Sequence, residues 1–192
     1  MDPSALRPLA RPPARDPRPG DLLVAAPAMG DPRFRRTVVY VLQHDDDGSA
    51  GVVINRRFEG ELRGLELPDW ALDAAVVHAG GPVSDDSLLG LAAVEATPAP
   101  LRRSVGPGIS VVDLDRLSEV PPFGPLQLFV GYAGWGAGQL AGELAQGDWL
   151  VVAGDPVDVL LVDPDDVWRH VLRRQPGAAR LWATLPDAVI EN

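Results

Sequence analysis

Cysteine and lysine are both absent from this 192-residue sequence, and each absence excludes a class of chemistry. Without cysteine the chain has no disulfide, no thiolate nucleophile and no thiolate ligand for zinc or an iron–sulfur cluster. Without lysine it has no Schiff-base amine and no phosphate-loop lysine, since all 17 cationic side chains are arginine. We therefore expect a protein without a bound cofactor.

Long apolar runs are also missing. No stretch reaches the roughly 18–20 residues that span a bilayer, and the first residues lack the apolar segment of a secretory signal. Acidic residues outnumber basic ones and give a formal net charge of −10. Because nucleic acids and anionic membranes bind best to a cationic face, both are disfavoured as partners. The sequence predicts a cytoplasmic protein.

Proline and arginine concentrate at the start of the chain. Residues 1–20 hold six prolines and four arginines against two aspartates, with almost no apolar periodicity. This composition predicts a disordered Pro/Arg-rich tail over residues 1–20 and a single domain over residues 21–192. The tail has a formal charge of +2, which leaves −12 on the domain given the total of −10. It could contact an acidic partner or the domain itself.

The first half of the domain contains a hairpin pattern. The apolar run 22–26 is typical of a buried strand, and it is followed by the β-branched run 37–42. An Asp-Gly turn at 45–48 then leads into a second β-prone run at 51–54. Further strands are expected at 76–79, 88–94 and 109–112, with part of a helix at 61–72 and a short helix from Asp113 to Leu117.

The second half combines a strand at 126–132, a helix at 137–146 and a strand at 149–153, which form a β-α-β unit. A last helix begins at Pro164 after the capping residue Asp163 and ends near Arg174. An early hairpin with a late β-α-β unit predicts the α+β class, a mixed and largely antiparallel sheet flanked by helices.

Four segments together resemble one protein family. They are PAMGDPRF at 27–34, SAGVVIN at 49–55, GGPV at 80–83 and GYAGWGAGQL at 131–140. In this order and at these separations they resemble the YqgE/AlgH family, from about Asp21 to the end of the chain. The resemblance implies an intracellular α+β protein whose antiparallel sheet is partly barrel-like. The family is largely uncharacterised and its name is associated with transcriptional regulation, but it brings neither a DNA-binding module nor a catalytic set.

The glycine-rich motifs supply the candidate ligand-binding residues, which are Asn55, Gly80, Gly81, Tyr132, Gly134, Trp135, Gly136 and Gly138. The segment 136–141 also fits the dinucleotide fingerprint G-x-G-x-x-A, and Asp155 lies where a ribose-binding acid would follow. The first glycine of a fingerprint should end the strand directly, whereas residues 132–135 come before Gly136 here, and only one β-α-β unit is present. We hypothesise instead a small anion or nucleotide site formed by amide groups at the start of the helix, with Trp135 or Tyr132 as a stacking surface.

Other patterns point to structure more than to chemistry. His44 and the aspartates 45–47 fit a hairpin turn better than a calcium or zinc site, and His78 and His170 lack zinc-site spacing. Ser49 is one residue out of place for the G-x-S-x-G nucleophile elbow of a hydrolase. Ser84 or Ser87 could form a catalytic triad only if the fold brought one of them to His78, and we favour polar loop residues instead. The cluster Arg33, Arg35 and Arg36 is expected to solvate a sheet edge, although it could anchor an acidic partner. We predict no catalytic residue and no metal site.

The sequence thus favours a regulatory or binding protein that acts through its glycine-rich face, with a protein or a small anionic ligand as partner. One alternative is an enzyme that acts on a small phosphorylated or acyl substrate in the same cleft. Another is a DNA-binding regulator, which the domain charge of −12 makes the least favoured.

Overall fold

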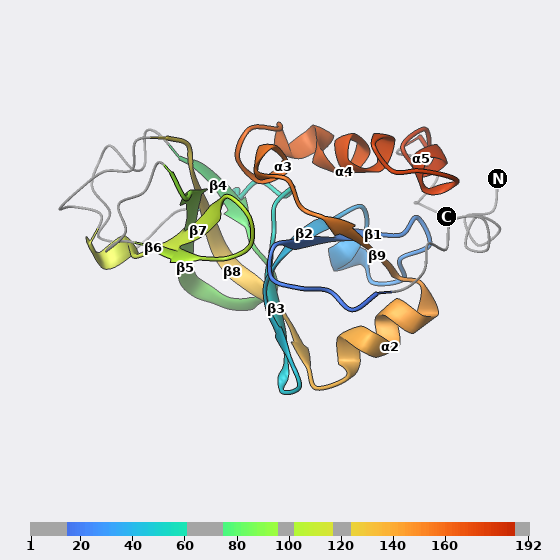
Figure 1. The fold of residues 1–192 in the computed structure, drawn as a ribbon, viewed down its shortest axis with the longest axis horizontal. Helices are drawn as coiled ribbons and strands as arrows, with labels where there is room; N and C mark the ends of the chain where they lie inside the picture. The colour runs from blue at the N-terminus through green and yellow to red at the C-terminus, as the bar shows by residue number, and fades with distance from the viewer. Residues whose placement is uncertain (1–14, 61–74, 96–101, 117–123, 187–192) are drawn as a thin grey trace.

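The computed structural model describes residues 15–60, 75–95, 102–116 and 124–186 (Figure 1). Nine strands form the sheet of this described part: β1 (Asp21–Ala25), β2 (Val38–Asp45), β3 (Gly48–Val53), β4 (Val76–Ala79), β5 (Val83–Ala93), β6 (Arg102–Ser104), β7 (Ile109–Val112), β8 (Leu126–Gly136) and β9 (Trp149–Ala153). Its helices are η3 (Pro32–Phe34), η5 (Leu114–Arg116), α2 (Gln139–Gln146), α3 (Pro156–Leu160), α4 (Pro164–Arg173) and α5 (Ala179–Trp182).

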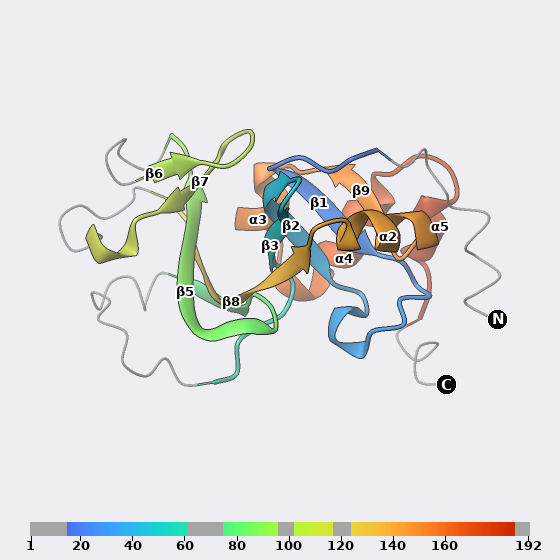
Figure 2. The same ribbon diagram turned by 90° about the horizontal axis from the view of Figure 1, so that it is seen from below.

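The sheet is a curled half-barrel, which confirms the α+β class. Its strand order is β6-β7-β5-β8-β3-β2-β1-β9, and β4 pairs with β8 beside this path. Among the described strands, β4 with β8 is the parallel pair and the other pairings are antiparallel. The strong bend of β5 lies at an irregular register between Val83 and Leu88, and Figure 2 shows the strand curving there.

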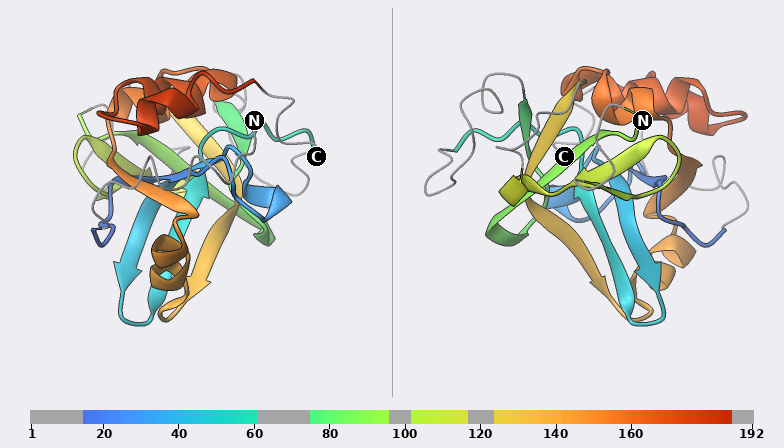
Figure 3. Two further views of the ribbon diagram at one scale, coloured as in Figure 1. Left: turned by 90° about the vertical axis from the view of Figure 1, so that its right-hand side faces the viewer. Right: turned by 60° about the vertical axis from the view of Figure 1, so that its left-hand side comes forward.

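The strands β1 and β2 are buried on both faces. Leu22 and Val24 of β1 pack into one core with α4, whereas Leu23 and Ala25 pack into a second core with α2. Figures 1 and 3 show α3, α4 and α5 over one face of the sheet and α2 against the other. An apolar residue at every position of a strand is what burial on both faces requires, and this explains the uninterrupted run 22–26.

The strand β8 joins the two parts of the sheet. Its first half pairs with β4 and β5, and its last residues, 133–136, pair with β3. Gly131, where the partner changes, has a φ of +69°, and a Cβ there would lie 2.6 Å from the Gly81 carbonyl oxygen. The predicted strand end at residue 132 is therefore too early, because the glycine-rich motif continues as strand to Gly136.

Most of the other predicted elements are confirmed. The hairpin β2–β3 turns between Asp45 and Gly48, and Asp163 caps α4 by accepting a hydrogen bond from the Asp165 amide. The strand–helix–strand sequence β8, α2, β9 is also present, but β3, β2 and β1 lie between its two strands. The helices α3 and α5 were not expected. The predicted helix at 61–72 lies outside the described residues.

The start of the chain is described only from Arg15 onward. Residues 1–14 of the predicted tail lie outside the described part. Arg15 forms a salt bridge with Asp21 at 2.6 Å, and the Gly20 amide donates to the carbonyl oxygen of Val41 at 2.9 Å. Residues 15–20 therefore contact the domain.

Candidate functional site

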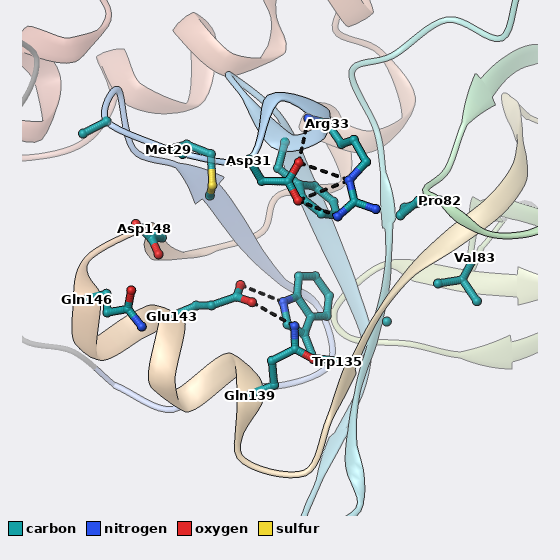
Figure 4. A pocket seen from close by; sticks show the side chains of 14 residues that line it. Met29, Asp31, Arg33, Pro82, Val83, Trp135, Gln139, Glu143, Gln146 and Asp148 are labelled. Carbon is teal, nitrogen blue, oxygen red and sulfur yellow. Dashed lines mark hydrogen bonds and ion pairs between the residues drawn. The ribbon is translucent and has the colours of Figure 1, made fainter.

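A cleft of about 490 Å³ lies between the turn that contains η3 and the helix α2. The segment 28–34 forms one wall, Pro82 and Val83 form the opposite edge, and α2 with Asp148 closes the remaining side. Gly134 and Trp135 of β8 complete the lining (Figure 4). The cleft therefore brings together three of the motifs that carried the family resemblance.

An aromatic cluster supports the cleft. The ring of Phe34 stacks on Trp135 with 6.3 Å between centroids and meets the edge of Trp149 at 5.5 Å. The two indoles lie 5.9 Å apart at 81°. Leu140 and Leu144 of α2 pack into the same core, so rigid side chains hold α2 in place beside the cleft.

Glu143 projects from α2 toward these indoles. Its Oε2 atom accepts hydrogen bonds from Trp135 Nε1 at 2.9 Å and from Trp149 Nε1 at 2.7 Å. Its Oε1 atom accepts from Nε2 of the Gln139 side chain at 3.0 Å. Figure 4 shows this carboxylate at the edge of the cleft, between Trp135 and Asp148. Three neutral donors fix its position without neutralising its charge.

An ion pair lies on the opposite wall. Asp31 accepts from the Arg33 amide at 2.9 Å, which starts η3, and binds the Arg33 guanidinium at 2.7 Å. The side-chain hydrogen bond from Arg33 lowers the pKa of Asp31, so this carboxyl is ionised at neutral pH. The lining thus holds three carboxylates, from Asp31, Glu143 and Asp148, against the guanidinium of Arg33, which is a formal charge of −2.

A second cleft of about 440 Å³ adjoins the first. It is lined by the β2–β3 hairpin, including Asp45, Asp47 and Ser49, and by Tyr132 of β8. Val83, Gly134 and Trp135 line both clefts. Two acidic hollows therefore share one wall on the glycine-rich strand.

Three of the predicted site residues line these clefts, and they are Tyr132, Gly134 and Trp135. Gly80 and Gly81 have a different role, because β4 ends directly against β8. A Cβ at Gly80 would lie 2.3 Å from the Gly131 carbonyl oxygen, and one at Gly81 would lie 2.2 Å from the Tyr132 carbonyl carbon. These glycines permit close backbone contact and line neither cleft.

Asn55 also has a structural role. Its Oδ1 accepts from the Val38 amide and its Nδ2 donates to the Arg36 carbonyl oxygen, each at 2.7 Å. The side chain thereby joins the end of β3 to the start of β2. Because both of its polar atoms are engaged there, the prediction that it binds a ligand has no support from the geometry.

We expect Asn55→Ala to lower the free energy of unfolding by about 2 kcal/mol, because it leaves two backbone groups without partners beside the buried Val38. Urea unfolding followed by tryptophan fluorescence measures this loss. Asn55→Asp keeps the acceptor for the Val38 amide and should cost less. A loss within about 0.5 kcal/mol, as for an ordinary surface substitution, would refute the bridging role.

The start of α2 was predicted to offer backbone amide groups to an anion, and the structure shows a different arrangement. The Gly136 amide already donates to the Gln139 side chain at 3.2 Å, and Trp135 is buried, with 6% of its surface exposed. Gly138 is the N-cap of α2 in the left-handed conformation, at φ +72°, and lines neither cleft. Gly136 directly ends β8, as a dinucleotide fingerprint requires, but the neighbouring strands are not those of a nucleotide-binding sheet. Asp155 caps α3 instead of facing a ribose site.

The histidine and serine candidates have structural partners. His78 is buried and stacks on Phe129, and its Nε2 lies 2.8 Å from the Gln127 amide oxygen. The Ser87 hydroxyl donates to the Ser84 carbonyl oxygen. Across the hairpin, His44 Nδ1 lies 2.7 Å from Ser49 Oγ. Among the residues that the structure describes, no group of three acidic or histidine side chains is placed to hold a metal ion.

The arginine cluster divides among different roles. Arg33 pairs with Asp31, whereas Arg36 donates to the carbonyl oxygens of Leu185 and Pro186 and lies over the ring of Trp168. Arg36 therefore fastens the end of the described chain to α4. The expectation that this cluster solvates a sheet edge is therefore wrong for Arg36.

Sequence reasoning missed Glu143, Asp148 and the role of Asp31 in the cleft. The motif GYAGWGAGQL drew attention to its glycines, but the carboxylate lies eight residues after Trp135, on the next element. The sequence places Glu143 on the expected helix and Asp148 directly after Gly147, but it does not show that both face the turn around Asp31.

Several known proteins are similar to this chain in sequence. The family model described as AlgH-like matches residues 22–180. The UPF0301 protein of Streptomyces coelicolor is 48% identical over 179 residues, which cover 88% of this chain and 92% of that protein. A UPF0301 protein of Rhodococcus jostii is 44% identical over 185 residues, 91% of each.

Two solved structures share the architecture. The crystal structure of a Corynebacterium diphtheriae protein superposes with a TM-score of 0.79 at 30% identity, covering 94% of this chain and 97% of that one. The solution structure of the AlgH protein from Pseudomonas aeruginosa gives a TM-score of 0.66 at 26% identity, covering 84% of this chain and 91% of that one. In the described part of this chain, no helix is long and apolar enough to cross a bilayer.

Proposed function

This chain belongs to the AlgH-like family, and we propose that it is a binding protein that takes a cationic group into the cleft between η3 and α2. The observation that carries this proposal is the carboxylate of Glu143, which two indole N–H groups hold at the edge of a cleft with a formal charge of −2. Regulation through such binding is the form of activity that the site supports best.

The charge of the residues that line the cleft determines whether it attracts a cation or an anion. Within the described lining Arg33 is the cation, and Asp31 already binds it at 2.7 Å. Glu143, whose three hydrogen-bond donors are neutral, therefore adds a negative charge to the cleft that no cation of the described lining offsets. Two unit charges about 4 Å apart near a protein surface interact by about 4 kcal/mol, so an entering anion meets repulsion and an entering cation attraction.

The rigidity of the site favours binding further. The three hydrogen bonds to Glu143 fix its side chain before any ligand arrives, so binding pays little additional side-chain entropy. Phe34 and Met29 offer apolar contact to the aliphatic part of an arginine or amine ligand. The small anion expected from the helix amides stays a prediction, and the test includes it.

Calorimetric titration of the full chain at low salt tests the proposal with agmatine as the cation and with inorganic phosphate and AMP as anions. We expect agmatine to bind and the two anions to give no heat. Glu143→Gln should weaken agmatine binding roughly tenfold or more, because a charge-assisted hydrogen bond contributes about 1.5–3 kcal/mol. The glutamine oxygen can still accept from both indoles, whereas the hydrogen bond from the Gln139 side-chain amide is lost because the new amide group faces it as a second donor.

The matched control is Glu59→Gln, at an exposed glutamate that lines neither cleft. It should bind agmatine as the unmodified chain does. Raising the salt concentration should weaken agmatine binding, because exposed charges are screened. Absence of agmatine binding, or equal binding by Glu143→Gln, would overturn the cationic site, and binding of phosphate or AMP in the cleft would restore the anion prediction.

A further inference from the structure

We propose that the two adjoining clefts form one groove that binds an extended peptide segment of a partner protein, with one arginine or lysine side chain in each cleft. This inference rests on the proposed function, since the first cleft takes the first cation. The second cleft, at the β2–β3 hairpin, takes the second.

The second cleft has the same charge as the first. The described residues that line it include Asp45 and Asp47 but no arginine. Asp45 accepts hydrogen bonds from the Gln43 side chain at 2.6 Å and from the Asp47 amide at 3.0 Å. The side-chain hydrogen bond from Gln43 lowers the pKa of Asp45, so both the turn and its charge are fixed at neutral pH. Asp47 is exposed at the rim.

The two clefts meet at Gly134, which is exposed on β8. Val83, Gly134 and Trp135 line both, and Gly134 contributes no side chain to the passage. Trp135 is 6% exposed, since its ring points into the core beneath. A Cβ at Gly134 would lie 3.2 Å from the Tyr132 ring and 3.8 Å from Val83 Cγ2, so these two side chains flank the point where a bound peptide crosses β8 from one cleft to the other.

Two clefts in series favour a linked ligand over two separate ones. Once one cation is bound, the second binds at a high effective concentration, so overall affinity rises without any new type of contact. Clefts of about 490 and 440 Å³ are each large enough for a single long side chain. An extended peptide places side chains about 3.3 Å apart per residue along its length, which lets its sequence match the spacing of the clefts.

The test uses Gly/Ser peptides of nine residues that carry either one arginine or two arginines spaced two, four or six residues apart. Fluorescence anisotropy of a labelled peptide with the full chain gives the affinity. We expect one of the two-arginine spacings to bind at least tenfold more tightly than the single-arginine peptide.

Asp47→Asn separates this inference from the proposed function. It should remove the gain in affinity of the two-arginine peptide over the single-arginine peptide, whereas the loss of agmatine binding caused by Glu143→Gln should be the same in the Asp47→Asn background as in the unmodified chain. Asp46→Asn is the control, because Asp46 is in the same turn but lines neither cleft.

The other outcomes are also decisive. If agmatine binds but no two-arginine peptide gains affinity, the groove is refuted and the cationic cleft stands. If agmatine fails to bind, both proposals fall. If spermidine binds as tightly as the best peptide and is weakened equally by Asp47→Asn, the groove is a polyamine site and the peptide partner is wrong.

Discussion

Gly81→Ala should destabilise the protein by roughly 3 kcal/mol or more, because a methyl group cannot be accommodated where β4 ends against β8. Its Cβ would lie 2.2 Å from the carbonyl carbon and 2.3 Å from the carbonyl oxygen of Tyr132. Both are backbone atoms of a central strand, so no side-chain rotation relieves the contact. The φ of +156° adds strain for any residue with a Cβ.

Gly142→Ala is the matched control. Gly142 lies on an exposed turn of α2, and a Cβ there meets nothing within 4 Å. Alanine should stabilise this helix by about 0.5–1 kcal/mol, since glycine is the poorer helix former. Urea unfolding of the two variants gives both values. If Gly81→Ala unfolded at the same urea concentration as the unmodified chain, the close contact of the two strands would be disproved.

The close strand contact at Gly81 shows why the role of each glycine in the glycine-rich motifs could not be predicted from sequence. A local pattern does not distinguish a glycine that leaves room for a ligand from one that leaves room for another strand. Gly80 and Gly81 are of the second kind, whereas Gly134 lies at the clefts. The difference is set by β8, whose partners come from residues about 50 and 80 positions earlier in the chain.

The elements with local signals were predictable. The hairpin β2–β3 has its Asp-Gly turn, and α4 has its cap, its proline and its apolar stripe. The helix α3 had a signal too, which was not recognised: Asp155 and Asp158 form a capping box, and Pro156 lies in the first turn. By contrast, α5 has four residues and no side-chain cap bond, so little in the sequence marks it.

The acidic cleft could be predicted only in part. Trp135 and the turn around Asp31 were recognised in the motifs, but their opposition to Glu143 depends on how α2 crosses the sheet. That crossing passes over β3, β2 and β1, and no pattern within the β-α-β segment specifies it. The net charge was consistent with an acidic cleft, because a domain with a formal charge of −12 readily forms an acidic surface.

The second large effect concerns Asp158, the buried carboxylate that links α3 to α4. Its side chain is completely buried, and its Oδ2 accepts from the Asp155 amide at 3.0 Å and from the Arg174 guanidinium at 2.5 Å. The other oxygen, Oδ1, lies 3.6 Å from His170 Nε2. Burying an ion pair has a large desolvation free energy, but removing one partner destabilises the fold more because the other charge is left buried without a counterion.

We expect Asp158→Ala to lower the free energy of unfolding by about 3 kcal/mol, the lower end for a broken buried pair, because Arg174 keeps a third of its side chain in solvent. Asp158→Asn retains the acceptor for the Asp155 amide and should lose roughly 1 kcal/mol. Urea unfolding at pH 7 measures both losses. A loss below about 0.5 kcal/mol for the alanine variant would show that the ion pair does not hold the two helices together.

The free energy of unfolding of the unmodified chain minus that of Asp158→Asn, measured as a function of pH, reports on this one carboxyl. Burial raises the pKa of Asp158 against the opposing charges of Arg174 and His170, with Asp155 adding to the rise. A carboxyl whose pKa is raised on folding is protonated more readily in the folded chain than in the unfolded one, so it stabilises the fold most at acid pH. Stability relative to Asp158→Asn should therefore fall as the pH rises from about 4, the ordinary pKa of an aspartate, toward neutrality. A difference that grew over this range would mean that the attraction of Arg174 outweighs burial and lowers the pKa.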